Sequence, residues 1–433
     1  MREMSCPVSN RSILKINNTI GLFEYLVVLV LILYLSNANR LVLFHSFTEQ
    51  PLIFFIPVLL SGILVLKHNI KFNKNFFLLI FFYMFYVIAI TIKYRNFYPS
   101  LLIHYPSIFF IAYSIIKSLK YKLFSIYEYL LYILSIIGIT LWIIQFVLGG
   151  DTLFGLLANI PKIEEFSHVT GGGINIIFYS VQPTSFSLIY NHLPPRNCGF
   201  AWEPGGFAVY LCLAIFINLF FMKNEKYSKR HLLVLLLALL TTQSTTGFFI
   251  LIIIGVFYYF NTNLKTVFLV LPLLIVVVVV IFSLPFMAEK IVRLVEDIER
   301  VDIIIEAGYG RDTSITPQRF TSFVIAIKDF FLNPLLGTGG ISGESWTSKV
   351  GVKISTITGI GNLLAHFGLV GFIFFLIATS RTSVLFSKSF NYKGKLLLLL
   401  IILSISISYG ILFFPLITCF WIFGLFHTDK AHN

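Results

Sequence analysis

Apolar runs alternate with short polar segments along almost the whole chain. Each run is roughly 16 to 20 residues long, about the length that a helix needs to cross the hydrocarbon core of a bilayer. The runs lie at residues 20–36, 51–66, 76–92, 100–116, 129–148, 204–222, 231–245, 246–260, 266–285, 361–380, 396–410 and 411–427. The pattern predicts an all-α polytopic membrane protein with about 12 transmembrane helices, in a single integral membrane domain over residues 1–433.

Two stretches leave the number of helices open. Residues 231–260 and 396–427 are each about 30 residues long, so at about 1.5 Å per residue each is one steeply tilted helix or two short ones. The polar turn Gln243–Gly247 interrupts the first stretch, and Gly410 with Pro415 interrupts the second.

Composition agrees with a membrane protein. Of the 433 residues, 57% are hydrophobic and 12% are charged, whereas a soluble domain carries about a quarter charged residues. The net charge of +13 comes from short basic clusters between the apolar runs, which favours membrane orientation over nucleic-acid binding. The four cysteines are far apart and form no CxxC, so the sequence indicates neither a disulfide framework nor a zinc site.

Lys and Arg in short loops mark the cytoplasmic side of a membrane. On the twelve-helix model, the inner segments hold 19 of the 32 Lys and Arg residues, which predicts a multi-pass membrane protein with both termini cytoplasmic. No cleavage site follows the first run, so we expect it to remain as the first helix. Two large loops, 149–203 and 286–360, then lie outside and contain most of the acidic residues. Function is expected there, because loops of this length are usually functional or disordered.

The second loop carries two helical patterns. Met287, Ile291, Leu294, Val295 and Ile298 recur at helical spacing among charged residues, which predicts an amphipathic helix on the membrane surface. A second helix is expected to begin at Thr316 and Pro317 and to end at Asn333. Its predicted apolar stripe is Phe320, Phe323, Val324, Ile327 and Phe331.

The end of the first loop holds the first candidate site. Pro204 suits the first turn of a helix and keeps Glu203 out of helical geometry, so the Glu203 carboxylate stands at a helix N-terminus. It is either a helix cap or a base that orients substrate. Arg196 lies seven residues upstream, and an arginine just outside a membrane is often a contact to a phospholipid headgroup.

Other candidates are more distant in the chain. The turn with Gln243 and Ser244 could line a site, although Ser/Thr packing between helices is the plainer interpretation. Arg319, in the first turn of its helix, suits a phosphate, and Arg311 next to Tyr309 suits either a phosphate or a surface ion pair. The Gly-rich run after Pro334 lacks the lysine of a phosphate-binding P-loop, so no nucleotide site is predicted.

His366 lies within a predicted transmembrane helix. An intramembrane imidazole suggests function, although an isolated one is commonly a satisfied core residue. No HExxH motif exists, and the sequence predicts neither a metal site nor a cofactor.

Together these motifs resemble the Wzy-type O-antigen polymerases and the related O-antigen ligases. The resemblance rests on Arg196 through Glu203-Pro204, the Ser/Thr-Gly turn at 244–247, Arg319 ahead of Asn333-Pro334-Leu335-Leu336-Gly337-Thr338-Gly339, and Asn362 ahead of Gly368-Leu369-Val370-Gly371. The ligase branch typically has a His immediately before that Asn, where this chain has Gly361, so the resemblance favours the polymerase.

The resemblance implies an inverting, metal-independent glycosyltransferase that joins repeat units carried on undecaprenyl diphosphate at the outer face of the inner membrane. Its diphosphate-binding arginines would be Arg196, Arg319 and Arg311, and its Glu-Pro element Glu203-Pro204. Cleavage at a diphosphate places negative charge on the leaving group, which suits cationic donors. Glu203 is the first candidate for a base and His366 the second. The expected substrate-lining residues are Tyr309, Gln243, Ser244 and Asn362.

The expected partners are the lipid-linked oligosaccharide donor and acceptor, the bilayer and a chain-length regulator protein, with no nucleic acid. Three alternatives stay open: an O-antigen ligase that joins polysaccharide to lipid A-core, a lipid-linked oligosaccharide flippase or ion-coupled transporter, and a non-catalytic assembly partner. Transporters commonly place ionisable residues near the bilayer midplane, whereas the predicted spans here contain little more than Glu24 as an acidic residue.

Overall fold

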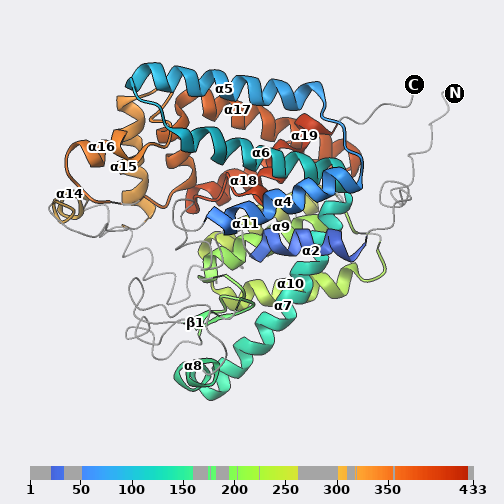
Figure 1. The fold of residues 1–433 in the computed structure, drawn as a ribbon. Coiled ribbons are helices and arrows are strands. Elements are labelled where there is room, and N and C mark those ends of the chain that lie inside the picture. The colour runs from blue at the N-terminus through green and yellow to red at the C-terminus, as the bar shows by residue number, and fades with distance from the viewer. Residues whose placement is uncertain are drawn as a thin grey trace.

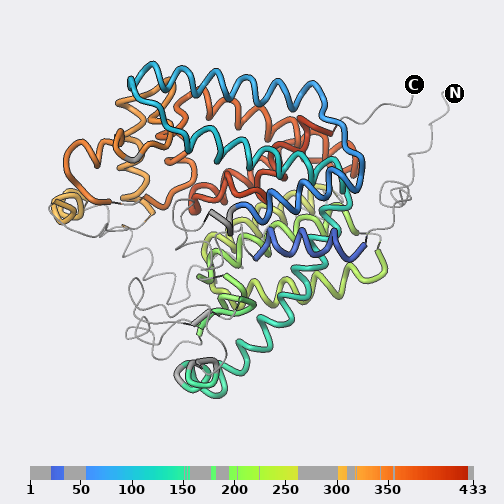
Figure 2. Tube along the Cα trace, in the orientation of Figure 1, coloured from blue at the N-terminus to red at the C-terminus, as the bar shows by residue number. Residues whose placement is uncertain are grey.

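The apolar runs fold as helices that lie side by side (Figure 1). The computed structural model describes residues 21–33, 51–158, 174–175, 177–181, 195–201, 203–223, 225–261, 301–309, 317, 319–354 and 356–427. The chain path is followed most easily in the tube of Figure 2, from blue at the N-terminal helices to red at the C-terminal ones. The predicted helix at 287–298, the apolar run 266–285, Arg311 and Thr316 lie outside the described residues.

The first half of the chain is mainly helical. Its helices are α2 (Leu22–Leu33), α4 (Pro51–Lys67), α5 (Lys74–Tyr94), α6 (Pro99–Leu119), α7 (Lys122–Leu148) and α8 (Gly150–Ala158). A short antiparallel sheet follows, in which β1 (Ile174–Asn175) pairs with β2 (Ser180–Val181), Ile174 standing opposite Val181.

The second half continues the bundle. Its helices are α9 (Pro204–Phe220), α10 (Ser228–Thr242), α11 (Thr245–Phe260), α14 (Val301–Glu306), α15 (Arg319–Leu332), the 3-10 turn η2 (Ser342–Glu344), α16 (Trp346–Lys349), α17 (Gly359–Ser389), α18 (Leu397–Ser408) and α19 (Pro415–Phe426). Both open stretches of the sequence are pairs of short helices, because Gln243 and Ser244 separate α10 from α11, and Tyr409 to Phe414 separate α18 from α19.

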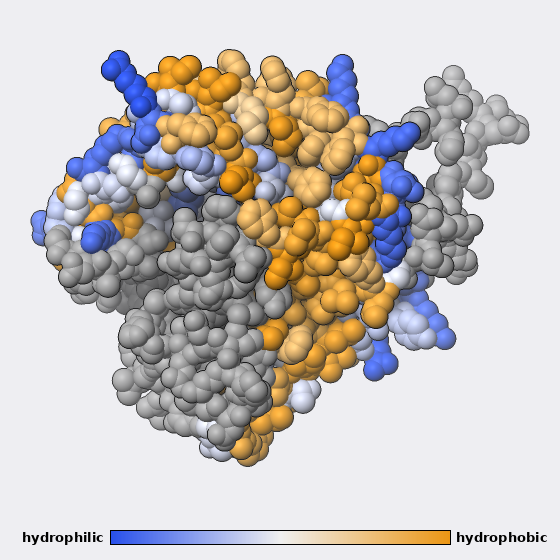
Figure 3. All heavy atoms as spheres, viewed as in Figure 1, coloured by the Kyte–Doolittle hydropathy of each residue, from blue (hydrophilic) through white to orange (hydrophobic). Residues whose placement is uncertain are grey.

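Four of the described helices have the length and composition of membrane helices. Every predicted apolar run within the described residues coincides with a helix, and α5, α6, α7 and α17 are each long and apolar enough to cross a membrane. On the coloured part of the face seen in Figure 3, hydrophobic side chains lie between hydrophilic groups at its two sides. The chain is therefore a helical protein with the surface of a membrane protein.

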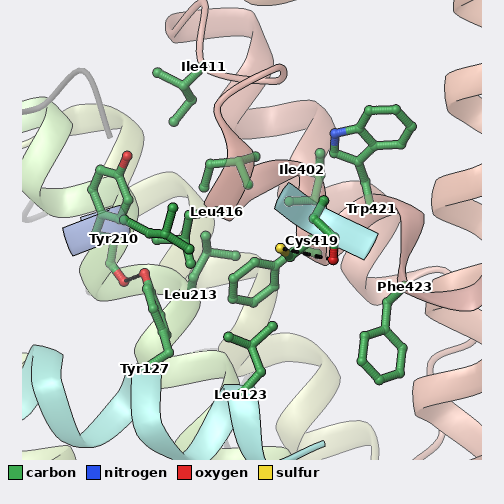
Figure 4. Close-up of a cluster of buried hydrophobic side chains, with 14 of the residues drawn as sticks. Leu123, Tyr127, Tyr210, Leu213, Ile402, Ile411, Leu416, Cys419, Trp421 and Phe423 are labelled. Carbon is green, nitrogen blue, oxygen red and sulfur yellow. Dashed lines mark hydrogen bonds between the residues drawn. The ribbon is translucent and has the colours of Figure 1, made fainter. Parts of the chain in front are cut away.

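The core lies where α7, α9, α18 and α19 meet (Figure 4). Apolar side chains fill this region, and the few polar atoms within it are bonded to backbone. The Tyr127 hydroxyl donates to the carbonyl of Tyr210 at 2.8 Å, and the Cys419 thiol donates to the carbonyl of Ala112 at 3.9 Å. Satisfied polar groups of this kind are what a lipid-embedded bundle requires.

Glu24 and Glu128 are almost completely buried inside the bundle, and both are paired. Glu24 accepts hydrogen bonds from Lys67 at 2.8 Å and from His68 at 2.9 Å, which ties α2 to the end of α4. Glu128 meets Asn218 at 2.7 Å and His231 at 3.1 Å, which ties α7 to α9 and α10. The predicted apolar run 129–148 begins one residue after Glu128. Helix α7 begins earlier, at Lys122, so Glu128 is, with Glu24, a second acidic residue within an apolar helix.

The Gly-rich run after Pro334 packs against a break in α17. At Gly368 the backbone leaves helical geometry, with φ 61° and ψ −160°. The N–H groups of Thr338 and Gly339 donate to the carbonyls of Ala365 and His366, both at 2.8 Å, and Leu369 N–H donates to the carbonyl of Pro334 at 2.8 Å. The N–H groups of Thr338 and Gly339 are therefore already hydrogen-bonded to α17 and are not free to bind a phosphate.

We expect Gly368→Ala to lower the free energy of unfolding by at least about 2 kcal/mol, because its Cβ would lie 2.3 Å from the carbonyl oxygen of Leu335 in a left-handed backbone conformation. Thermal unfolding of the purified protein in detergent measures the change. Gly255→Ala in α11 is the matched control, since a Cβ there meets no atom within 4 Å. Equal unfolding temperatures for the two variants would contradict the proposed packing.

The most buried residues of helix α15 are not those of its predicted apolar stripe. Its buried residues are Thr321, Ser322, Ile325, Ala326 and Asp329, whereas Phe331 is 73% exposed. The residues of the predicted apolar stripe are thus less buried than these five. Ala326 and the ring of Phe323 lie against Gly361 of α17, whereas Phe331 faces outward, as in a helix at a membrane surface. The helix also begins at Arg319, two residues after the predicted start.

Candidate functional site

Arg319 is the centre of the candidate site. Its position at the start of α15 directs the guanidinium toward the ends of α9, α11 and α18. Nη1 donates to the Thr246 hydroxyl at 3.2 Å, and Nη2 donates to the Tyr409 hydroxyl at 2.7 Å. The guanidinium carbon also lies 4.4 Å from the centre of the Tyr409 ring. These contacts fix the plane of the guanidinium, and 36% of the side chain remains exposed.

Tyr409 occupies space that only a glycine leaves free. It follows α18, and its hydroxyl oxygen lies 1.6 Å from the position that a Cβ on Gly205 would take. Gly205 is the second residue of α9, so the absence of its side chain lets the phenol reach Arg319. The Thr246 hydroxyl is held in turn by Ser408, at 2.8 Å.

Glu203 lies on the other side of Arg319. It occupies the N-cap position of α9, before Pro204 in the first turn, yet its side chain makes no capping hydrogen bond. Its carboxylate oxygen is 3.7 Å from Nη2 of Arg319, an ion-pair distance that is too long for a strong hydrogen bond. The structure thus favours the second interpretation of Glu203, a carboxylate that faces a site.

The charges of this cluster act on one another. Burial by itself lowers the pKa of Arg319, but the neighbouring Tyr409 and Glu203 stabilise the cation and the net result is a raised pKa. Burial lowers the pKa of Arg196, and the positive charge of Arg319 lowers it further. The two arginines are therefore close enough to repel each other. An anion bound between them would reduce this repulsion.

Arg196 is anchored on the end of α10. Its Nε and Nη2 donate to the carbonyls of Thr242 and Gln243, both at 3.2 Å. The last carbonyls of a helix carry partial negative charge, so they position a cation well. Within the described residues, Nη1 of Arg196 makes no hydrogen bond. Nearby Cys198 is buried, and burial raises the pKa of its thiol to about 12, so it is no nucleophile at neutral pH.

Several helix N-termini converge on Arg319. The first residues of α9 and α11 contact it through Gly205 and Thr246, and α15 begins at Arg319 itself. The start of α17 packs against Tyr409, the residue that follows α18, because a Cβ on Gly359 would lie 2.2 Å from the carbonyl oxygen of Tyr409. Each N-terminus contributes partial positive charge, so their sum favours an anion beside the two arginines.

The predicted substrate-lining residues have different roles. Gln243 has φ 49° and ends α10, while Ser244 caps α11 by accepting from Gly247 N–H, so both form the turn on which Arg196 rests. Asn362 lies near Gly410 and exchanges hydrogen bonds with Thr356, at 2.7 and 3.3 Å. These residues shape the surroundings of the site.

Two predicted residues lie apart from this cluster. Tyr309 is exposed and forms a bridge with Val352, and it makes no hydrogen bond or ring contact with Arg319 or Glu203. His366 is on α17, and its ring lies beside Gly340. Within the described part of the chain its imidazole makes no hydrogen bond. The structure does not bring His366 to the carboxylate of Glu203.

Sequence analysis missed Tyr409 and Ser408 as site residues, whereas Thr246 lies in the candidate turn at 243–247. The interruption between the two C-terminal helices was a usable signal, because a Tyr-Gly pair at a break between apolar helices marks backbone that needs polar partners. Their roles depend on contacts with α15, 90 and 73 residues away for Tyr409 and Thr246.

Comparison of the chain with family models, curated proteins and solved structures found no match. Among the described residues, no group of three or more His, Cys, Asp and Glu side chains is placed to hold a metal ion. The site's chemistry is that of two arginines, one carboxylate and converging helix N-termini: it can bind a polyanion and offer a base beside it.

Proposed function

We propose that this protein is an inverting, metal-independent glycosyltransferase that polymerises undecaprenyl-diphosphate-linked repeat units into O-antigen or a related surface polysaccharide. The observation that carries the proposal is Arg319, fixed by Tyr409 and Thr246 with Glu203 3.7 Å away. A fixed guanidinium among helix N-termini suits a diphosphate, and the motifs that hold it are those that resemble Wzy-type polymerases.

In the proposed reaction, a hydroxyl of the acceptor sugar attacks the anomeric carbon of the donor sugar from the face opposite the diphosphate. The new carbon–oxygen bond forms as the bond to the diphosphate breaks, and its electron pair leaves with the diphosphate. The hydroxyl proton passes to the Glu203 carboxylate. Arg319 and Arg196 act by stabilising the charge that develops on the leaving group.

The proposed orientation is that of an inner-membrane protein with the Arg319 site on the outer side. The distribution of lysine and arginine supports this, because inner segments hold most of them. Cysteine substituted at Lys223, in the short segment between α9 and α10, should react only with membrane-permeant maleimide in intact cells. Labelling of that position by an impermeant reagent would contradict the orientation.

The direct test is polymer growth by the purified protein in proteoliposomes. With lipid-linked repeat units as sole substrate, we expect ladders of polysaccharide on gels, with a rate unchanged by EDTA and without any ion gradient. Transfer of finished chains to lipid A-core, with no ladder from single units, would instead indicate a ligase. Movement of the units across the bilayer without bond formation would indicate a flippase, and an EDTA-sensitive rate would contradict metal independence.

A further inference from the structure

A cavity of about 480 Å³ lies between α5 and α17, with α6 and α19 behind it. Its α5 wall runs from Asn75 to Tyr86 through Leu78, Leu79 and Phe82, which recur at helical spacing. The helix rises about 16 Å between these two residues, close to half of the roughly 30 Å hydrocarbon core. The α5 wall therefore has about the length of one leaflet, and the volume of the cavity is that of a ligand pocket.

The cavity opens toward the membrane-facing surface. Phe82 on α5 is 64% exposed and Val370 on α17 is 52% exposed, although both line the cavity. Figure 3 shows hydrophobic side chains over this part of the molecule, where α5 forms the outermost helix of Figure 1. A lipid chain could enter from the side without crossing a polar surface.

The two ends of the cavity differ in chemistry. At one end the Tyr86 hydroxyl donates to the carbonyls of Leu336 and His366, both at 2.9 Å, which closes the cavity with the Gly-rich run. At the other end stands Arg381, an exposed residue on α17 that lines the cavity. Arg381 makes no hydrogen bond or ion pair with any residue that the structure describes. An apolar groove with an unpaired cation at its mouth matches an anionic lipid.

We propose that this cavity binds one acyl chain of an anionic phospholipid, whose phosphate lies against Arg381. The lipid belongs to the leaflet on the Arg381 side, because its headgroup lies against that residue. The cavity lining reaches Leu363 near the start of α17, but the proposed headgroup site at Arg381 lies toward the other end of that helix, away from Asn362.

Trp421 lines the cavity and provides a native reporter. In a variant with Trp142, Trp202 and Trp346 replaced by phenylalanine, we expect phosphatidylglycerol brominated in its acyl chains to quench the remaining fluorescence saturably in detergent micelles. Brominated phosphatidylcholine should need about fivefold more lipid for half-saturation, since one arginine near an anionic headgroup contributes about that factor.

Two further substitutions, each with a control, distinguish binding of the lipid headgroup from binding of the acyl chain. Arg381→Gln should bring phosphatidylglycerol to the level of phosphatidylcholine, whereas Lys388→Gln, an exposed cation on the same helix outside the cavity, should change nothing. Val370→Phe should reduce quenching by both lipids, and Leu369→Phe next to it should not. Non-saturable quenching, equal half-saturation for both lipids, or no effect of Val370→Phe would overturn the proposal.

Discussion

Replacing Arg319 by alanine is expected to slow polysaccharide growth by about 100- to 1,000-fold, the usual cost of removing one fixed donor from a developing charge. Arg319 donates to Thr246 and Tyr409 and faces Glu203, so its guanidinium cannot be replaced by a neighbour. The measurement is the initial rate of chain growth in proteoliposomes with purified lipid-linked units. The protein level in the membrane is to be matched between variants.

Arg319→Lys tests geometry against charge. A lysine keeps the positive charge but lacks the planar guanidinium, whose two separate nitrogens reach Thr246 and Tyr409, so we expect it to recover only a small part of the rate. The matched control is Lys328→Ala on the same helix, whose ammonium lies over Trp346 at 4.8 Å, away from Tyr409. If Arg319→Ala and Lys328→Ala polymerised equally fast, Arg319 would have no role in catalysis.

The helices of this protein could be predicted because their signal is local. A run of apolar residues with polar ends needs no knowledge of its neighbours, and the short pairs α10 and α11 or α18 and α19 were visible as polar interruptions. Pro204 at the start of α9 follows from the geometry of proline alone. Glu203 and Arg319 could also be predicted, since each stands at the start of a helix, where the partial positive charge of the N-terminus affects nearby charged groups and anions.

The packing partners could not be predicted in the same way. A hydrophobic period gives an apolar face but not which residues a neighbouring helix covers. In α15 the most buried residues are Thr321, Ser322, Ile325, Ala326 and Asp329, and none of them is a phenylalanine. Tyr409 meets Arg319 only because Gly205 has no side chain, and nothing near residue 409 in the chain reports that. Such contacts arise from tertiary structure and stay invisible to local patterns.

Gly205→Ala is expected to slow polymerisation about a hundredfold while leaving the protein in the membrane. The new Cβ would lie 1.6 Å from the Tyr409 hydroxyl oxygen, so the phenol must move and Arg319 loses its 2.7 Å hydrogen bond. A misplaced catalytic group costs about a hundredfold in rate for a shift near 1 Å. Chain growth per molecule of membrane protein measures this loss.

The neighbouring glycine supplies the control. A Cβ on Gly206 would meet Ala201 and Glu203 at 3.6 and 3.7 Å, which are ordinary contacts, so Gly206→Ala should keep most of the rate. Tyr409→Phe alone should slow growth by removing the hydroxyl that Arg319 uses. If the overlap is the cause, Gly205→Ala combined with Tyr409→Phe should cost much less than the product of the two single effects, because the phenylalanine lacks the atom that the new methyl displaces. Multiplicative losses in the double variant would show that Gly205 acts independently of Tyr409.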